Sequence, residues 1–137
     1  MERALVIQLA KLGDFIQSTS FLAGLRQVRP EAEICLLGRE PSALEAARLS
    51  PLVDTVASSP EALAGQRFTA VYNLNSHPEA AGLGPKLKYD QYYGPILIEG
   101  ELRFPPAQMF LMALMRLGRR LGRFNLVDVW ASLVPEA

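Results

Sequence analysis

The sequence is poor in the residues that hold metals and form disulfides. Its 137 residues include one cysteine, Cys35, and one histidine, His77. A single cysteine cannot form an internal disulfide, so we expect Cys35 to be a small buried apolar residue in a reducing compartment. Because His77 has no second histidine or cysteine partner, no metal site is expected.

The chain also lacks an excess of charge and any long apolar run. Fourteen basic and fourteen acidic side chains cancel, which removes the general attraction that nucleic-acid-binding proteins have for phosphate. No stretch reaches the roughly 18 apolar residues of a membrane-spanning helix. Glu2 and Arg3 precede an apolar run that is too short for a secretory signal. We therefore expect a cytoplasmic protein, at most peripheral on the inner face of the cell membrane.

What the sequence does contain is a regular alternation of apolar runs and helical segments. Residues 4–10 (ALVIQLA) are almost entirely apolar, which is typical of a parallel strand covered on both faces. Strands are predicted at residues 4–9, 33–37, 52–56 and 68–74, with helices after Asp14, at 41–49 and at 59–65. The order predicts one α/β domain, a doubly wound parallel sheet with residues 4–9 near its centre.

The signals weaken after Pro78. Residues 80–87 resemble a short helix broken by glycines, and residues 89–95 and 96–104 are predicted to be extended, as a hairpin or an irregular loop around Gly94 and Gly100. Residues 107–117 predict an apolar helix, and residues 126–133 a last one. The basic residues between Arg103 and Arg123 favour a solvated connector, with a surface for anionic lipid as the alternative.

Asp14 is the candidate for chemistry. It follows the first strand and a Lys11-Leu12-Gly13 turn, and it is the only acid between Glu2 and Glu31. In open α/β sheets this carboxyl edge is where ligands bind. Spacing alone favours a structural role, because Asp is a preferred N-cap and Gln17 completes a capping box. The alternative is a base that takes a proton from a hydroxyl group as that group attacks an electrophile.

The first turn lacks the glycines of a dinucleotide site. Gly13 stands alone where the dinucleotide fingerprint needs three glycines, and no phosphate-loop lysine follows. A solvated loop lysine is the default for Lys11, with contact to an anionic ligand as the alternative. For His77 the default is a turn residue before Pro78, with hydrogen bonding at the sheet edge as the alternative.

One family shares these features. The segment IQLAKLGDFIQST (residues 7–19) resembles the opening motif of glycosyltransferase family 9, the lipopolysaccharide heptosyltransferases. AVYNLN (70–75) and FNLVD (124–128) are similar to later segments of that family. Ser20 departs from the proline often found there.

The resemblance implies a GT-B architecture of two Rossmann-like domains, of which residues 1–137 would be the N-terminal acceptor-binding one. The C-terminal domain, which binds the nucleotide sugar, would be absent from this chain. The implied enzyme moves a heptose-type sugar, with inversion, from a donor such as ADP-heptose to a phosphorylated lipopolysaccharide-core glycolipid. Asp14 would be its general base, and the isolated domain would be inactive.

The residues expected to bind the acceptor belong to the opening motif and to the end of the fourth predicted strand. They are Lys11, Gly13, Gln17, Ser18, Asn75 and His77. The main rival function is a noncatalytic α/β ligand-binding or regulatory module, such as a receiver domain. A receiver needs a cluster of acids at its first strand, where this chain has Arg3. A self-contained nucleotide enzyme is the second rival, and the single glycine of the first turn argues against it.

Overall fold

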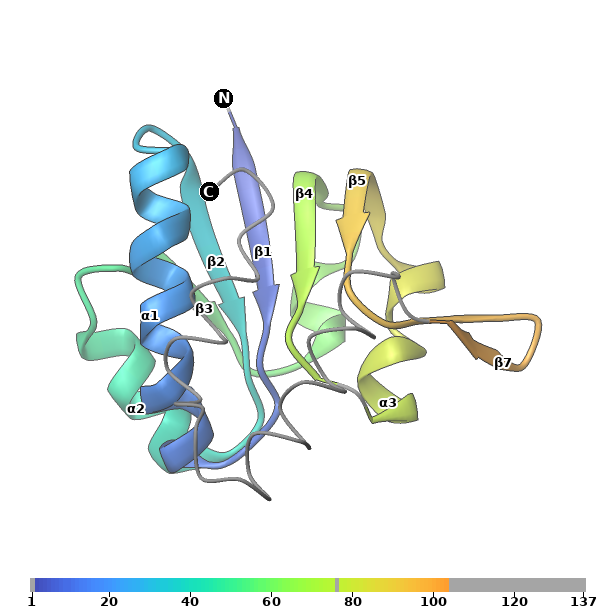
Figure 1. The fold of residues 1–137 in the computed structure, drawn as a ribbon, viewed down its shortest axis with the longest axis horizontal. Helices are drawn as coiled ribbons and strands as arrows, with labels where there is room; N and C mark the ends of the chain where they lie inside the picture. The colour runs from blue at the N-terminus through green and yellow to red at the C-terminus, as the bar shows by residue number, and fades with distance from the viewer. Residues whose placement is uncertain (1, 76, 104–137) are drawn as a thin grey trace, which may run out of the picture.

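The computed structural model describes residues 2–75 and 77–103. Its centre is a five-stranded parallel sheet with helices on both faces (Figure 1). The strands are β1 (Arg3–Ile7), β2 (Glu33–Leu37), β3 (Thr55–Ala57), β4 (Arg67–Asn73) and β5 (Lys88–Tyr93). They lie in the order β3-β2-β1-β4-β5. The doubly wound, Rossmann-like fold predicted from the sequence is confirmed.

Strand β1 is the central strand because both of its faces are covered. Its residues Ala4, Leu5, Val6 and Ile7 are at most 1% exposed. Successive side chains point to opposite faces, so Ala4 and Val6 belong to one core cluster and Leu5 and Ile7 to another. A strand that lies between two apolar layers has no polar face, which explains the unbroken apolar run.

The helices divide between the two layers. Helices α1 (Leu12–Val28) and α2 (Pro41–Leu49) cover one face, and η1 (Pro60–Leu63), α3 (Pro78–Ala81) and η2 (Gly84–Lys86) lie on the other. Phe21, Leu22 and Leu25 of α1 are at most 1% exposed. Each buried side chain of this kind stabilises the fold by about 1.5–3 kcal/mol. The bounds predicted for β2 and α2 are confirmed.

The prediction was incomplete for the second half of the sheet. Residues 88–93 form β5, a fifth parallel strand that pairs with β4, and β3 begins three residues later than predicted. Strand β5 lies at the edge of the sheet, and Lys88, Asp90 and Gln91 are exposed. An edge strand with one solvated side does not need an apolar run, so its sequence carries only a weak strand signal.

A small antiparallel hairpin, β6 (Ile96–Ile98) with β7 (Glu101–Arg103), projects from the body of the domain (Figure 1). Its two-residue loop is Glu99-Gly100, with φ of 51° and 81°. Positive φ at both positions is the pattern of a type I′ hairpin turn. Of the alternatives predicted for residues 89–104, a hairpin is present around Gly100, whereas residues 88–93 belong to the main sheet.

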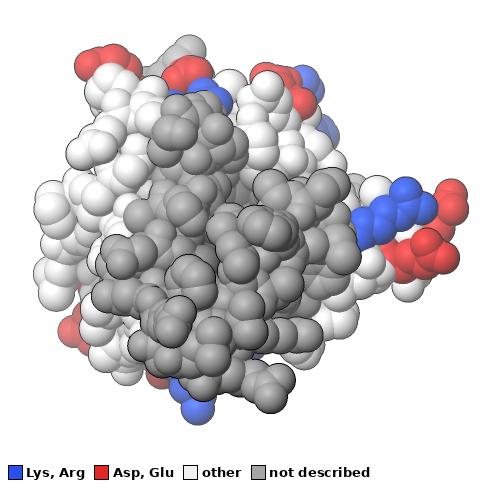
Figure 2. Space-filling model, viewed as in Figure 1, with Lys and Arg blue, Asp and Glu red and all other residues white. Residues whose placement is uncertain are grey.

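Of the basic residues predicted to cluster between Arg103 and Arg123, only Arg103 is among the described residues. Arg103 lies at the base of the hairpin's second strand, 3.8 Å from the Glu101 carboxylate, and Figure 2 shows acidic and basic atoms together on this projection. The other arginines up to Arg123, and the helices predicted at residues 107–117 and 126–133, lie outside the described residues. No helix in the described part of the chain is long and apolar enough to cross a membrane.

Gly94 is required where the chain leaves the sheet. Its φ is 119°, and a Cβ atom there would overlap the carbonyl oxygen of Asn73. The turn at Gly94 brings the Pro95 carbonyl oxygen within 2.9 Å of the side-chain nitrogen of Asn73, which donates to it. The glycine thus allows β5 and the hairpin to close against β4.

We predict that Gly94→Ala lowers the free energy of unfolding by about 3 kcal/mol or more, because backbone strain and steric overlap combine. Gly100→Ala is the matched control, since its φ is also positive but a Cβ there meets nothing within 4 Å. That variant should lose only about 1–2 kcal/mol. Equal losses in urea unfolding would show that the close approach to Asn73 is unimportant.

Candidate functional site at the carboxyl edge of the sheet

The chain reverses direction across the sheet next to β1. From β1 it proceeds outward to β2 and β3, and it then returns to β4 on the other side of β1. Ligands of open α/β sheets bind at the carboxyl ends of the strands beside such a switch point. Here that position is the loop between β1 and α1 together with the residues that follow β4.

Asp14 lies in the first turn of α1 and is not its N-cap. The helix begins at Leu12, Lys11 is the N-cap residue, and no side chain caps the helix. The amide of Phe15 donates to the Lys11 carbonyl at 3.0 Å, which places the N-cap three residues before Asp14. The capping interpretation of Asp14 is therefore wrong.

The Asp14 carboxylate is exposed and available. Within the described part of the chain it accepts no hydrogen bond and forms no ion pair. Lys11 and Gly13 are exposed beside it, and a Cβ at Gly13 would meet nothing within 4 Å. Gly13 is thus not needed to relieve crowding inside the domain. It leaves open space next to the carboxylate.

The other residues expected in the opening motif divide between surface and core. Gln17 is partly exposed on α1. Ser18 is 1% exposed, and its hydroxyl donates to the Phe15 carbonyl at 2.7 Å. The structure therefore places Ser18 in the core and not beside Lys11 and Asp14.

Asn75 closes the space between the ends of β1 and β4. Its side-chain oxygen accepts from the Leu9 amide at 3.2 Å, and its nitrogen donates to the Ile7 carbonyl at 2.8 Å. The side-chain amide continues the pairing of the two strands beyond Asn73. Asn75 thus lies in the floor of the candidate site, with both ends of its amide engaged.

Two further amides support this floor, and the sequence analysis did not single them out. Gln8 is 2% exposed, and its side-chain oxygen accepts from the Ala10 amide at 3.3 Å. Asn73 is equally buried; its oxygen accepts from the Asn75 amide at 2.9 Å. Their position at the carboxyl ends of apolar strands was the only available signal.

Tyr92 completes the floor on the side of β5. Its hydroxyl donates to the Pro95 carbonyl at 2.7 Å, the same oxygen that accepts from Asn73. Burial raises the pKa of Tyr92 to about 12. Tyr92 is therefore a neutral hydrogen-bond donor at physiological pH and not a base.

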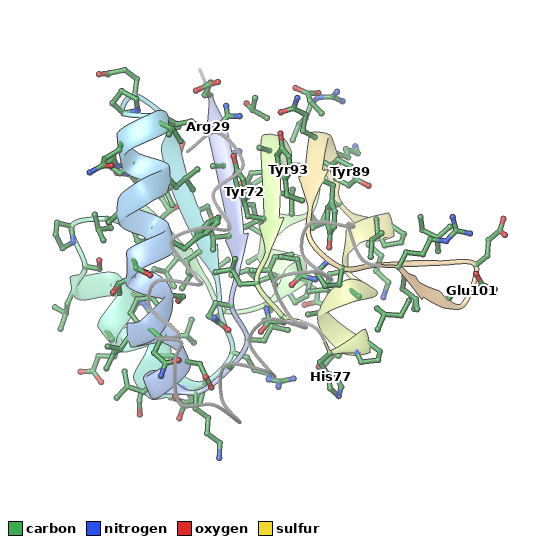
Figure 3. The ribbon with its side chains drawn as sticks, in the orientation of Figure 1. Arg29, Tyr72, His77, Tyr89, Tyr93 and Glu101 are labelled. Carbon is green, nitrogen blue, oxygen red and sulfur yellow. The ribbon has the colours of Figure 1, made fainter. Side chains whose placement is uncertain are left out.

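His77 lies at the same end of the sheet as the start of α1 (Figure 3). It is the N-cap of α3, and its Nδ1 accepts from the Glu79 amide at 3.2 Å. In the neutral ring Nε2 then carries the proton. The ring is exposed, so both the turn role and an outward hydrogen-bonding role are compatible with its placement.

Residues 2–75 and 77–103 contain no group of three or more His, Cys, Asp and Glu side chains that could hold a metal ion. Cys35 is buried, and burial raises the pKa of its thiol. A shallow pocket of about 70 Å³ lies between Pro60, Leu63 and Lys88. These residues precede or begin β4 and β5, so the pocket is at the opposite edge of the sheet from Asp14.

The fold and this edge define an α/β domain of the doubly wound class with an exposed carboxylate at its switch point. Neither a protein-family model nor a curated protein matches the sequence. Solved structures do match the fold. Escherichia coli heptosyltransferase WaaC with ADP has a TM-score of 0.66 at 16% identity, over 96% of this chain and 45% of that one.

Two further structures agree with this match. WaaC with ADP-2-deoxy-2-fluoro heptose has a TM-score of 0.65 at 15% identity, over 96% of this chain and 47% of that one. The glycosyl transferase family 9 structure from Veillonella parvula has a TM-score of 0.60 at 15% identity, over 99% of this chain and 42% of that one. The chain therefore has the fold of a glycosyltransferase domain and spans less than half the length of these structures.

We predict that Asn75→Ala lowers the free energy of unfolding by about 1–3 kcal/mol, because the Ile7 carbonyl and Leu9 amide lose their partner. Gln17→Ala, at a partly exposed position of α1, is the control and should change stability by about 0.5 kcal/mol or less. Chemical denaturation of both variants checks this. An Asn75→Ala protein as stable as the control would remove Asn75 from the floor of the site.

Proposed function

We propose that this chain is the acceptor-binding half of an inverting glycosyltransferase, with Asp14 as its general base. The observation that carries the proposal is the exposed Asp14 carboxylate, without a partner in the described chain, at the switch point of a sheet with a glycosyltransferase fold. Lys11, Gly13, Gln17 and His77 are the remaining candidates for contact with the acceptor.

In the proposed reaction an acceptor hydroxyl attacks the anomeric carbon of a nucleotide sugar. The new carbon–oxygen bond forms on the face opposite the diphosphate, and the electron pair of the breaking bond leaves with the nucleotide. Asp14 takes the hydroxyl proton late, when the attacking oxygen has become acidic. A carboxylate suits this step, because the reaction needs a proton acceptor only in the transition state.

The donor would be a nucleotide-linked heptose, since the WaaC structures hold ADP and an ADP-heptose analogue. A phosphorylated lipopolysaccharide-core glycolipid is the proposed acceptor, approached at the cytoplasmic face of the membrane. The groups that bind the donor and stabilise its leaving diphosphate would belong to a second domain. No glycine-rich loop follows β1 to take that role here.

We predict that Asp14→Asn lowers turnover by about 10²–10⁴-fold in a polypeptide that contains both halves. Asn keeps the shape of the side chain but cannot accept the proton. Stability should change little, because the Asp14 carboxylate forms no hydrogen bond or ion pair within the described chain. Glu45→Gln, which neutralises an exposed carboxylate on α2, is the control. Near-normal turnover of a folded Asp14→Asn enzyme would show that Asp14 is not the general base.

The chain of 137 residues by itself should neither transfer sugar nor bind a nucleotide sugar tightly. The physical reason is that its first turn offers one glycine and no phosphate loop. Calorimetric titration with ADP-sugars checks this expectation. A micromolar dissociation constant, or transfer by the isolated chain, would favour a self-contained nucleotide enzyme. Absence of transfer even by a polypeptide that contains both halves would instead leave the noncatalytic binding module as the better description.

A further inference from the structure

The carboxyl edge holds a second cluster of polar side chains, formed by Arg39, His77 and Glu79. Arg39 Nη1 donates to Glu79 Oε2 at 2.6 Å, and the Glu79 amide donates to His77 Nδ1 at 3.2 Å. Arg39 follows β2, and the other two residues follow β4. Because β1 lies between these strands, the ion pair spans about 10 Å of the edge, two strand spacings.

The backbone on both sides of this ion pair is fixed. The Gly38 amide donates to the Ala57 carbonyl at 3.0 Å, and the Glu40 carboxylate accepts from the Ala43 amide at 3.0 Å. On the other side Ala80, next to Glu79, is 1% exposed. Both side chains therefore extend from rigid positions, as recognition residues need.

The ion pair leaves most of the guanidinium unused. Arg39 has five N–H donors, and in the described chain only the bond to Glu79 engages them. The two side chains are 58% and 56% exposed, and a pair exposed to this degree adds little to stability. The remaining donors form the planar set that binds two oxygens of a phosphate or carboxylate.

Arg39 stabilises the ionised form of the Glu79 carboxylate. Its hydrogen bond and charge hold the pKa of Glu79 below the usual range, and His77 adds to this effect. Glu79 is thus an anion at neutral pH and opposes a second anion near Arg39. The Nε2–H of His77, directed away from Glu79, supplies a further donor.

We propose that Arg39 recognises an oxyanion on the acceptor, with His77 as a second donor and Glu79 as the counter-ion that weakens this binding. The inference rests on the proposed function for the identity of the ligand as an acceptor. The binding itself depends only on the guanidinium, its exposure and its fixed position. The shared chemistry is a phosphate or carboxylate group on a sugar.

NMR titration of the chain tests this directly, because His77 is its only histidine and its ring protons report on the site. The probes are glucose 1-phosphate, glucuronate and inorganic phosphate, with glucose as the neutral control. We expect saturable shifts with the anionic probes and none with glucose. Comparison of the two anionic sugars with inorganic phosphate separates a sugar phosphate, a sugar acid and free phosphate as the source of the anion.

Arg39→Gln should weaken binding by about tenfold or more, the effect of losing one charge-assisted interaction. Arg48→Gln, an exposed arginine near the far end of α2, is the matched control and should bind as the unaltered chain does. Glu79→Gln keeps an acceptor for Arg39 but removes the opposing charge, so it should tighten binding several-fold. Equal affinities of the two arginine variants, or unchanged affinity on Glu79→Gln, would overturn the proposal.

Failure of this inference can be told apart from failure of the proposed function. Asp14→Asn should bind the anionic probes normally, because Asp14 is assigned to proton transfer. Arg39-dependent binding in a polypeptide that contains both halves and still transfers no sugar would retain the anion site and exclude the transferase. Transfer that is insensitive to Arg39→Gln would retain the transferase and exclude the anion site.

Discussion

The structure depends on the burial of β1 between two parallel neighbours. Its residues pair with β2 on one side and with β4 on the other, Ile7 lying opposite both Leu37 and Asn73. A strand held on both edges and covered on both faces cannot shift in register, because a shift of one residue would exchange its two core faces. The position of the β1–α1 turn, and with it Asp14, follows from this pairing.

The same pairing brings three strand ends together and leaves their last polar groups to be satisfied. Side-chain amides satisfy these groups: Gln8, Asn73 and Asn75 form hydrogen bonds with backbone groups at or just beyond the strand ends. Buried amides are stable only when they are hydrogen-bonded. The floor of the edge is therefore rigid and uncharged, and the ionisable groups Asp14, Arg39 and His77 stand exposed above it.

An uncharged floor with exposed ionisable groups suits a domain that presents a reacting hydroxyl. An acid–base group works best when its surroundings hold it in place without taking its proton-accepting oxygens. Asp14 meets the second part of that condition, because its carboxylate oxygens accept no hydrogen bond within the described chain, whereas Glu79 is engaged by Arg39. The likeness to solved glycosyltransferases at 15–16% identity gives the fold, and the proposed chemistry rests on these local differences between carboxylates.

The sequence by itself determined the succession of the first four strands and their helices along the chain, the central position of β1 and the placement of Asp14 at a helix start, because apolar periodicity follows directly from burial on one or two faces. It could not place β5, whose edge position removes the need for an apolar run. Nor could it give Asp14 its true place in α1, because the first backbone bond of the helix, to Lys11, depends on where β1 ends. The burial of Ser18 depends on what packs against α1, and the contacts of Asn75 with Leu9 and of Arg39 with Glu79 join segments far apart in the chain. Only the tertiary structure decides such contacts, because no local pattern records which strands become neighbours.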